Sequence, residues 1–306
     1  MKLTKENIMN IEMQLYNKAR DIDVAFYNSF MDEESKEFIL DGLMMYVNQD
    51  GGFGNGLYID DYNTNSSVYQ TYEALRMLDI VGYDSKCKNP LFQTILAKAG
   101  NYLFNRQELM DGAWNPIDEK NCQFAHSVKM DYVKDFKKKW GFHPTAAILG
   151  YCFVMFEPTK AYYKKAMKQI GYAFSYFDEK EILEDYDFIS FNSLLGSLKK
   201  SGQFLEEAKK IEGKLIMQAS NHLNDTNFKF AAYLSNCEVK DETLKIAIEQ
   251  NLDELIKKQA SHGLWEHKED WGTTQFPEAD SAALKWLGAE TVNTIVLLLQ
   301  YGRVEL

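Results

Sequence analysis

Two adjacent acids, Asp60 and Asp61, follow a glycine-rich stretch that begins at Val47 and reads VNQDGGFGNGLYIDDYNTNSSVYQ. Ser67 and Gln70 form an S-x-x-Q capping box, which predicts that a helix begins directly after this stretch. The acids therefore lie just ahead of a helix N-terminus, where negative charge is favoured. They are either a helix cap with a solvated neighbour, or catalytic carboxyls at a cavity mouth, where desolvation raises a carboxyl pKa and equips it for acid–base chemistry.

A second cluster of chemically capable side chains lies in the segment HGLWEHKEDWG, which supplies His262, Trp265, Glu266, His267, Glu269, Asp270 and Trp271. Trp265 and Trp271 flank the acids, and indole faces suit stacking on a sugar ring or stabilising a developing cation. Asp270 is the acid that we expect opposite Asp60. The alternative is that Trp265 packs the fold and the acids face water.

A third candidate lies in the connection over residues 116–142, because connections of this length in a compact domain are often functional. Cys122 and His126 are four residues apart, and His143 follows the connection. With Asp131 they form a conceivable zinc set, but no paired-ligand motif supports it, and we predict no metal. We expect His126 and His143 to bind substrate as part of a lid near a cavity rim.

These residues must be positioned by helices, which fall into two kinds. Charged and apolar residues mix at helical spacing over residues 33–47, 91–106, 159–179, 203–220 and 242–259. Segments without any charge alternate with them, over residues 145–156, 189–198 and 291–302. A helix that is apolar or neutral all round is surrounded by protein. The pattern predicts an all-α fold with an outer ring of helices around an inner ring.

The turns repeat one pattern of a glutamine, a glycine, one residue and an aromatic residue, centred on Gly51, Gly112 and Gly263. Glycine past a helix end adopts the left-handed conformation that stops the helix, and the aromatic residue then folds back over the junction. Trp114 and Trp265 are two of these aromatic residues. The spacing indicates repeats of about 50 residues, six of which roughly fill the chain.

The opening NQDGGFGNGLYIDDYNTNSSVYQTYEALRML, with HPTAAILGY and the closing GLWEHKEDWG, resembles bacterial prenyltransferase-like proteins of the terpenoid-cyclase and protein-prenyltransferase superfamily. The resemblance implies a single domain over residues 1–306, an (α/α)6 toroid of helical hairpins around a central cavity. It also implies an acid at the position of Asp60, which makes Asp60 the preferred member of its pair. It implies no established activity.

The catalytic motifs known on that scaffold are missing from this sequence. Class II terpene cyclases use D-x-D-D, whereas neither Asp-x-Asp sequence here is followed by another aspartate. Protein prenyltransferases hold zinc with an Asp-x-Cys pair, and no aspartate stands two residues before any of the four cysteines. The resemblance therefore implies a fold for this chain but identifies none of its residues as catalytic.

The charge and amino-acid composition of the chain exclude several classes of binding partner. The net charge of −11 argues against binding to nucleic acid or an anionic membrane, which requires a basic face. The longest charge-free stretch is shorter than the roughly 20 residues that a membrane span needs, so we expect no span. Widely spaced cysteines without a C-x-x-C pair indicate reduced thiols, and we predict a cytoplasmic protein.

Three functions are compatible with these features. The first is an enzyme for a small, partly apolar substrate such as an isoprenoid, with Asp60 or Asp61 as the acid, Asp270 opposite, and Trp114, Trp265 and Trp271 as walls. The second is a carbohydrate-active enzyme, which requires two cavity carboxyls about 5–10 Å apart. The third is a non-catalytic binding protein. The sequence identifies no cofactor and no oligomeric state.

Overall fold

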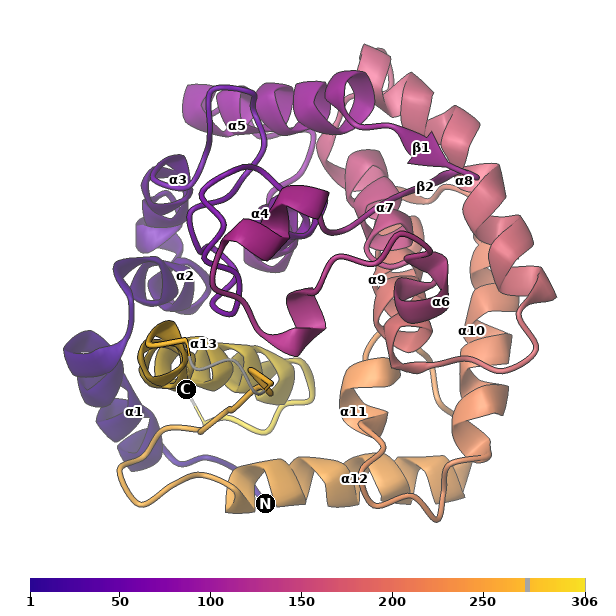
Figure 1. Cartoon of the computed structure of the whole chain (residues 1–306). Coiled ribbons are helices and arrows are strands. Elements are labelled where there is room, and N and C mark those ends of the chain that lie inside the picture. The colour runs from indigo at the N-terminus through magenta and orange to yellow at the C-terminus, as the bar shows by residue number, and fades with distance from the viewer. Residues whose placement is uncertain (273–275, 306) are drawn as a thin grey trace.

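The computed structural model describes residues 1–272 and 276–305, and it is built almost entirely of helices (Figure 1). The α-helices are α1 (Lys5–Lys18), α2 (Asp21–Met31), α3 (Phe38–Met44), α4 (Val68–Val81), α5 (Pro90–Asn101), α6 (Lys137–Trp140), α7 (Thr145–Met155), α8 (Ala161–Glu179), α9 (Asp185–Ser201), α10 (Leu205–Ser220), α11 (Phe230–Tyr233), α12 (Glu242–Lys257) and α13 (Glu278–Gln300). Short helical turns are η1 (Glu33–Ser35), η2 (Tyr102–Arg106), η3 (Glu119–Gln123) and η4 (Val128–Met130). In the described residues the sheet consists of β1 (Leu109–Met110) and β2 (Ala113–Trp114), paired antiparallel. The predicted all-α class is confirmed.

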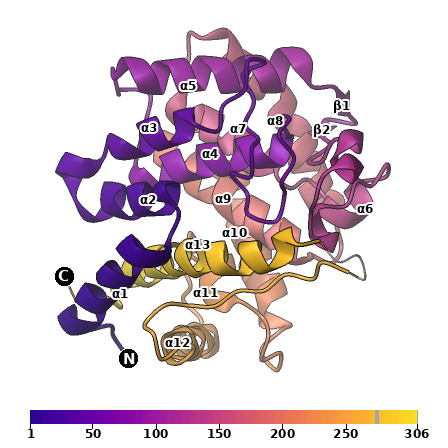
Figure 2. The ribbon, with the colours of Figure 1, turned by 60° about the vertical axis from the view of Figure 1, so that its left-hand side comes forward.

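The helices form two layers that alternate along the chain. Figure 1 shows α1, α3, α5, α8, α10 and α12 on the perimeter and α2, α4, α7, α9, α11 and α13 inside them. In Figure 2, α5 and α12 lie at opposite ends with inner helices between them. Inner helices contact their neighbours, as α13 does α2, α2 does α4, α4 does α7, and α7 does α9.

Helices α7 and α8 show why the layers differ. Helix α7 has no charged residue, and 10 of its 11 residues are buried. Helix α8 instead buries one face, whose residues recur every three or four positions: Tyr163, Ala166, Ile170, Ala173 and Phe177. Burial of a side chain such as Phe177 contributes about 1.5–3 kcal/mol. The prediction that the uncharged segment 145–156 is enclosed by protein is confirmed.

The three predicted glycine corners share one hydrogen-bond geometry. Gly51, Gly112 and Gly263 have positive φ angles of 96°, 81° and 92°, so the predicted left-handed conformation is confirmed. Two residues later, an aromatic backbone N–H donates to a threonine Oγ1 on an inner helix. The pairs are Phe53 with Thr71 at 3.1 Å, Trp114 with Thr145 at 3.0 Å, and Trp265 with Thr291 at 3.0 Å. The shared bond indicates copies of one structural unit.

Two local predictions are wrong. The capping box forms only in half, because Ser67 Oγ accepts from the Gln70 backbone N–H at 3.1 Å while the Gln70 side chain turns away to Asp61. The Ser67 backbone N–H instead donates to the Phe53 carbonyl oxygen. Residues 33–47 do not form one helix, because Asp32 caps the separate turn η1 ahead of α3.

One described helix, α13, is long and apolar enough to cross a membrane. It lies among the inner helices and contacts both α1 and α2. Its buried residues include Trp286, Val292, Ile295 and Leu298. These are the contacts of a core helix.

Candidate active site

Two adjoining cavities lie beside the first half of α13. The inner cavity, of about 230 Å³, has aromatic walls formed by Tyr58, Tyr69, Tyr72, Tyr186 and Trp286. The outer cavity, of about 560 Å³, is lined by Asp60, Asp270, Trp271 and Trp286 among others. Glu269 and Trp286 line both cavities, so they stand where the two meet.

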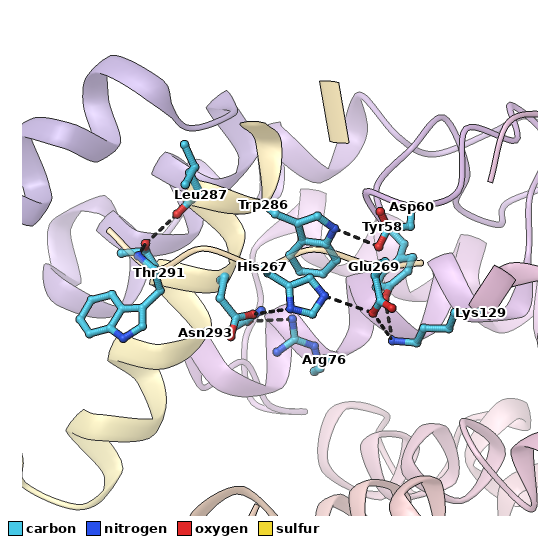
Figure 3. A network of polar contacts seen from close by, with 12 residues as sticks. Tyr58, Asp60, Arg76, Lys129, His267, Glu269, Trp286, Leu287, Thr291 and Asn293 are labelled. Atoms are coloured by element: carbon cyan, nitrogen blue, oxygen red, sulfur yellow. Dashed lines mark hydrogen bonds and ion pairs between the residues drawn. The ribbon is translucent and has the colours of Figure 1, made fainter. Parts of the chain in front are cut away.

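Asp60 is a fully buried carboxyl at this junction. The indole Nε1–H of Trp286 donates to Asp60 Oδ2 at 2.9 Å (Figure 3), whereas Oδ1 accepts no hydrogen bond from any described residue. Burial raises the pKa of Asp60 to about 6, since the Trp286 hydrogen bond offsets only part of the desolvation and the negative charge of Glu269 adds to it. Oδ1 is therefore a place for an exchangeable proton.

The pKa of Glu269 is shifted in the opposite direction from that of Asp60. His267 Nε2 lies 3.1 Å from Glu269 Oε1, and Lys129 Nζ lies 3.5 Å from the same oxygen. The His267 hydrogen bond is the largest influence and lowers the pKa of Glu269; burial opposes it, and the positive charge of Lys129 adds to the lowering, so the pKa lies below its ordinary value. Burial lowers the pKa of His267, but its hydrogen bond to Glu269 and the charges of Glu290 and Glu269 raise it overall. Glu269 thus lies between the Lys129 ammonium and the His267 imidazole, and its pKa is lowered while that of His267 is raised.

The long connection between β2 and α7 supplies Lys129. Its Nζ donates to the hydroxyl of Tyr58 at 2.7 Å and lies 5.1 Å from the centre of the Tyr58 ring. Figure 3 shows Lys129 reaching toward Glu269 and Tyr58 from the side opposite His267. The predicted functional role for residues 116–142 therefore rests on Lys129.

His143 lies at the inner cavity in a box of aromatic rings. It stacks on Tyr186 and Trp140 and meets the edges of Tyr69 and Tyr72. Burial lowers the pKa of His143 to about 3, so the imidazole is neutral. Its Nδ1 is buried and has no hydrogen-bond partner among the described residues. A neutral imidazole in an aromatic wall offers hydrogen bonding to a ligand without charge.

Two internal ion pairs complete the inner cavity. Arg20 binds Asp23 with two hydrogen bonds of 2.7 and 2.8 Å, and Arg76 binds Glu73 at 2.9 Å. Arg76 also donates to Asn293 of α13 at 3.2 Å. Because each arginine already faces a carboxylate, neither is a free cation for a phosphate or diphosphate group.

Asp60, His267 and Glu269 are the one group of three His, Cys, Asp or Glu ligand atoms within 4.8 Å of one another in the part of the chain that the structure describes. The Lys129 ammonium already lies 3.5 Å from Glu269 Oε1, and this positive charge opposes a divalent ion there. The residues considered for zinc lie apart: His126 contacts Asp131 at 3.0 Å, whereas His143 belongs to the inner cavity. Asp60, His267, Glu269 and Lys129 therefore fit a network of hydrogen bonds and ion pairs better than a metal site.

Four of the predicted site residues line a cavity. Asp60 lies at the junction, and His143 lines the inner cavity. Asp270 and Trp271 line the outer cavity, where Asp270 is exposed and accepts from the Gly272 backbone N–H at 2.7 Å. Trp271 packs edge-on against Tyr62.

The other four predicted residues have structural contacts and line neither cavity. Asp61 is buried, and its oxygens accept from the Asn63 backbone and the Gln70 side chain, which fixes the loop. Trp114 and Trp265 are corner residues, and the Trp265 indole donates to the Leu255 carbonyl oxygen at 2.7 Å. His126 is held between Phe124 and Asp131.

The sequence interpretation passed over residues that the structure brings to the site, above all Trp286, Glu290 and Asn293 on α13. Trp286 and Glu290 are four residues apart, and Glu290 and Asn293 are three apart. This spacing places them on one face of the helix. In the sequence, these side chains can be recognised as polar groups on one face of an otherwise apolar helix. The sequence predicts Asp270 as the acid opposite Asp60, whereas the structure brings His267 and Glu269 of the same cluster to Asp60.

The comparisons with protein-family models and with curated proteins give no match for this chain. The site must therefore be interpreted from its own geometry.

Proposed function

We propose that this protein is a hydrolase that cleaves a glycosidic bond in a small carbohydrate. The bond lies at the junction of the two cavities, with one sugar ring in the inner cavity and the leaving group in the outer cavity. Asp60 protonates the glycosidic oxygen as general acid, and Glu269 acts on the anomeric carbon. The observation that carries this proposal is the Asp60–Glu269 pair, because opposite pKa shifts in adjacent carboxyls assign one as acid and the other as carboxylate.

The walls of the inner cavity support a polar, ring-shaped ligand. Tyr58, Tyr186 and Trp286 offer aromatic faces and edges, and the charged and amide groups beside them offer hydrogen bonds to hydroxyls. A pyranose presents C–H bonds on its faces and hydroxyls around its rim, so it matches both kinds of surface. A volume of about 230 Å³ accommodates a single ring.

The same walls disfavour the isoprenoid alternative. The inner cavity is lined by the charged side chains of Arg20, Asp23, Glu73, Arg76, Lys129, Glu269 and Glu290. An apolar chain would strip water from these groups without replacing its hydrogen bonds, at a cost of about 1–3 kcal/mol for each polar group left unsatisfied. An isoprenoid diphosphate would also face acids at the outer cavity.

We further propose that the scaffold is an (α/α)6 toroid of the terpenoid-cyclase and protein-prenyltransferase superfamily, working in the cytoplasm. The support is the alternation of perimeter and inner helices along the chain and the repeated glycine corners. The four cysteines are free thiols, which agrees with a reducing compartment.

The test is a hydrolysis screen with aryl glycosides and oligosaccharides of α and β configuration. Replacement of either site carboxyl, Asp60→Asn or Glu269→Gln, should lower kcat/KM about 10²–10⁴-fold. Asp178→Asn, an exposed acid on perimeter helix α8, is the matched control and should retain wild-type activity. A protein that hydrolyses none of the glycosides, or an active protein indifferent to Asp60→Asn, would refute the proposal.

A further inference from the structure

The separation of the two carboxyls carries information about stereochemistry. An oxygen of Asp60 and an oxygen of Glu269 lie within 4.8 Å of each other. Inverting glycosidases hold their carboxyls about 6.5–9.5 Å apart to leave room for the attacking water, whereas retaining enzymes hold them about 5–5.5 Å apart. The Asp60–Glu269 pair is therefore closer than the inverting arrangement requires, which favours direct attack by Glu269 on the sugar.

We propose that the reaction proceeds with retention of anomeric configuration, through a covalent glycosyl ester on Glu269. This inference rests on the proposed function and adds the identity of the nucleophile. A hydrolysis product of inverted configuration would refute the covalent ester on Glu269 and leave the proposed hydrolysis standing.

The contacts of Glu269 leave one oxygen suited to attack. His267 binds Oε1, and Lys129 approaches the same oxygen. In the described residues, Oε2 accepts no hydrogen bond, and it is not among the buried atoms without a partner, so it is accessible. The other ring nitrogen of His267, Nδ1, lies 3.9 Å from Glu290 Oε2. The carboxylate is thus fixed by one oxygen and presents the other.

The contacts of Asp60 have the complementary arrangement. Trp286 binds Oδ2, and Oδ1 has no partner among the described residues. A proton on Oδ1 therefore has no acceptor among the described residues, and Asp60 lines the outer cavity, where we place the leaving group. The Trp286 ring also packs against His267, with 4.4 Å between ring centroids. Trp286 therefore contacts both Asp60 and the histidine that hydrogen-bonds Glu269.

The proposed reaction has two steps. Glu269 Oε2 forms a bond to the anomeric carbon while the bond from that carbon to the leaving oxygen breaks, and the Asp60 proton passes to the leaving group, which departs as an alcohol. Asp60, now a carboxylate, removes a proton from a water in the outer cavity. The resulting hydroxide attacks the anomeric carbon, the ester bond to Glu269 breaks, and the free sugar leaves with its original configuration.

The experiment traps the ester. The full-length protein is incubated with a panel of 2,4-dinitrophenyl 2-deoxy-2-fluoroglycosides of α and β configuration, and intact mass and peptide mapping follow. We expect one fluoroglycosyl group on the peptide that contains Glu269. Glu269→Ala should not be labelled, whereas Glu266→Ala, an exposed acid in the same turn, should be labelled as the wild type is.

A second readout separates chemistry from folding. With the corresponding dinitrophenyl glycosides, azide should restore turnover to Glu269→Ala and give a glycosyl azide of inverted configuration, because azide occupies the space left by the carboxylate. Proton NMR of the wild-type product should show the starting anomer first. An inverted product without labelling would overturn the nucleophile assignment while leaving the hydrolase proposal standing. Failure to hydrolyse any glycoside would overturn both.

Discussion

Replacing Asp60 with asparagine should stabilise the protein at alkaline pH and leave its stability nearly unchanged at pH 4. Asparagine has the same shape and keeps an oxygen for the Trp286 indole, but it cannot ionise. The folded-state pKa of Asp60 is about 6, against an unfolded value of about 3.9. Between these values the folded protein binds the proton that the unfolded chain releases, so the free energy of unfolding falls as pH rises.

The magnitude follows from the size of the shift. A pKa difference of about 2 units corresponds to about 3 kcal/mol at 1.36 kcal/mol per unit, reached fully above pH 7. The groups that set this value are Trp286, Glu269, His267 and Lys129, which all remain in the variant. Asp61 is also buried with a pKa of about 6, but its contribution is the same in both proteins and cancels.

Guanidinium unfolding at pH 4, 6 and 8 measures the difference directly. The stability of Asp60→Asn relative to wild type should rise by about 2–3 kcal/mol between pH 4 and pH 8. Asp178→Asn, whose carboxyl is exposed on α8, should show no such rise. Parallel pH curves for wild type and Asp60→Asn would show that burial does not raise the Asp60 pKa and would remove the basis for its role as acid.

Three further changes test the surrounding structure. Trp286→Phe removes a hydrogen bond worth about 1.5–3 kcal/mol to the ionised form of Asp60, so the basic limb of the hydrolysis pH profile should move up by about 1–2 units. Thr145→Val leaves the Trp114 backbone N–H buried without an acceptor and should cost about 1–3 kcal/mol in unfolding measurements. Gly263→Ala should lower the melting temperature, because its φ of 92° disfavours any side chain and the new Cβ would meet Asn10 Nδ2 at 2.3 Å; Gly213→Ala, with open space around it, should not.

Local rules account for the parts of the fold that the sequence predicted. Gly51, Gly112 and Gly263 have the predicted positive φ because glycine adopts it without strain, and that property is visible in a single chain. The prediction that they stop the helices is wrong, since α3 already ends at Met44 and α12 at Lys257, and Gly112 lies in the turn between β1 and β2. The uncharged segment 145–156 is buried because nothing on it can face water at low cost. The S-x-x-Q pattern correctly predicted that α4 begins after Ser67, but the reciprocal bond of the box is missing because the Gln70 side chain has a competing partner, Asp61, earlier in the loop.

The site was harder to predict because its contacts join distant parts of the chain. The bond between Asp60 and Trp286 spans 226 residues, and no periodicity or motif encodes such a pairing. Lys129 comes from an irregular connection, where side-chain direction has no repeating rule. Trp114 and Trp265 were expected as cavity walls, but the same corner geometry that identified them turns them into the packing between helices.

Helix α13 connects the stability of the fold with the completeness of the site. It supplies Trp286 to Asp60, Glu290 to His267 and Asn293 to Arg76, so the polar groups of both cavities are completed only when this last helix docks against α2. A helix selected for packing alone would carry apolar residues at these three positions, because buried polar groups gain little net stability even when they are paired. Their presence on one face of a core helix is a local conflict of the kind that folded proteins retain where a site requires it.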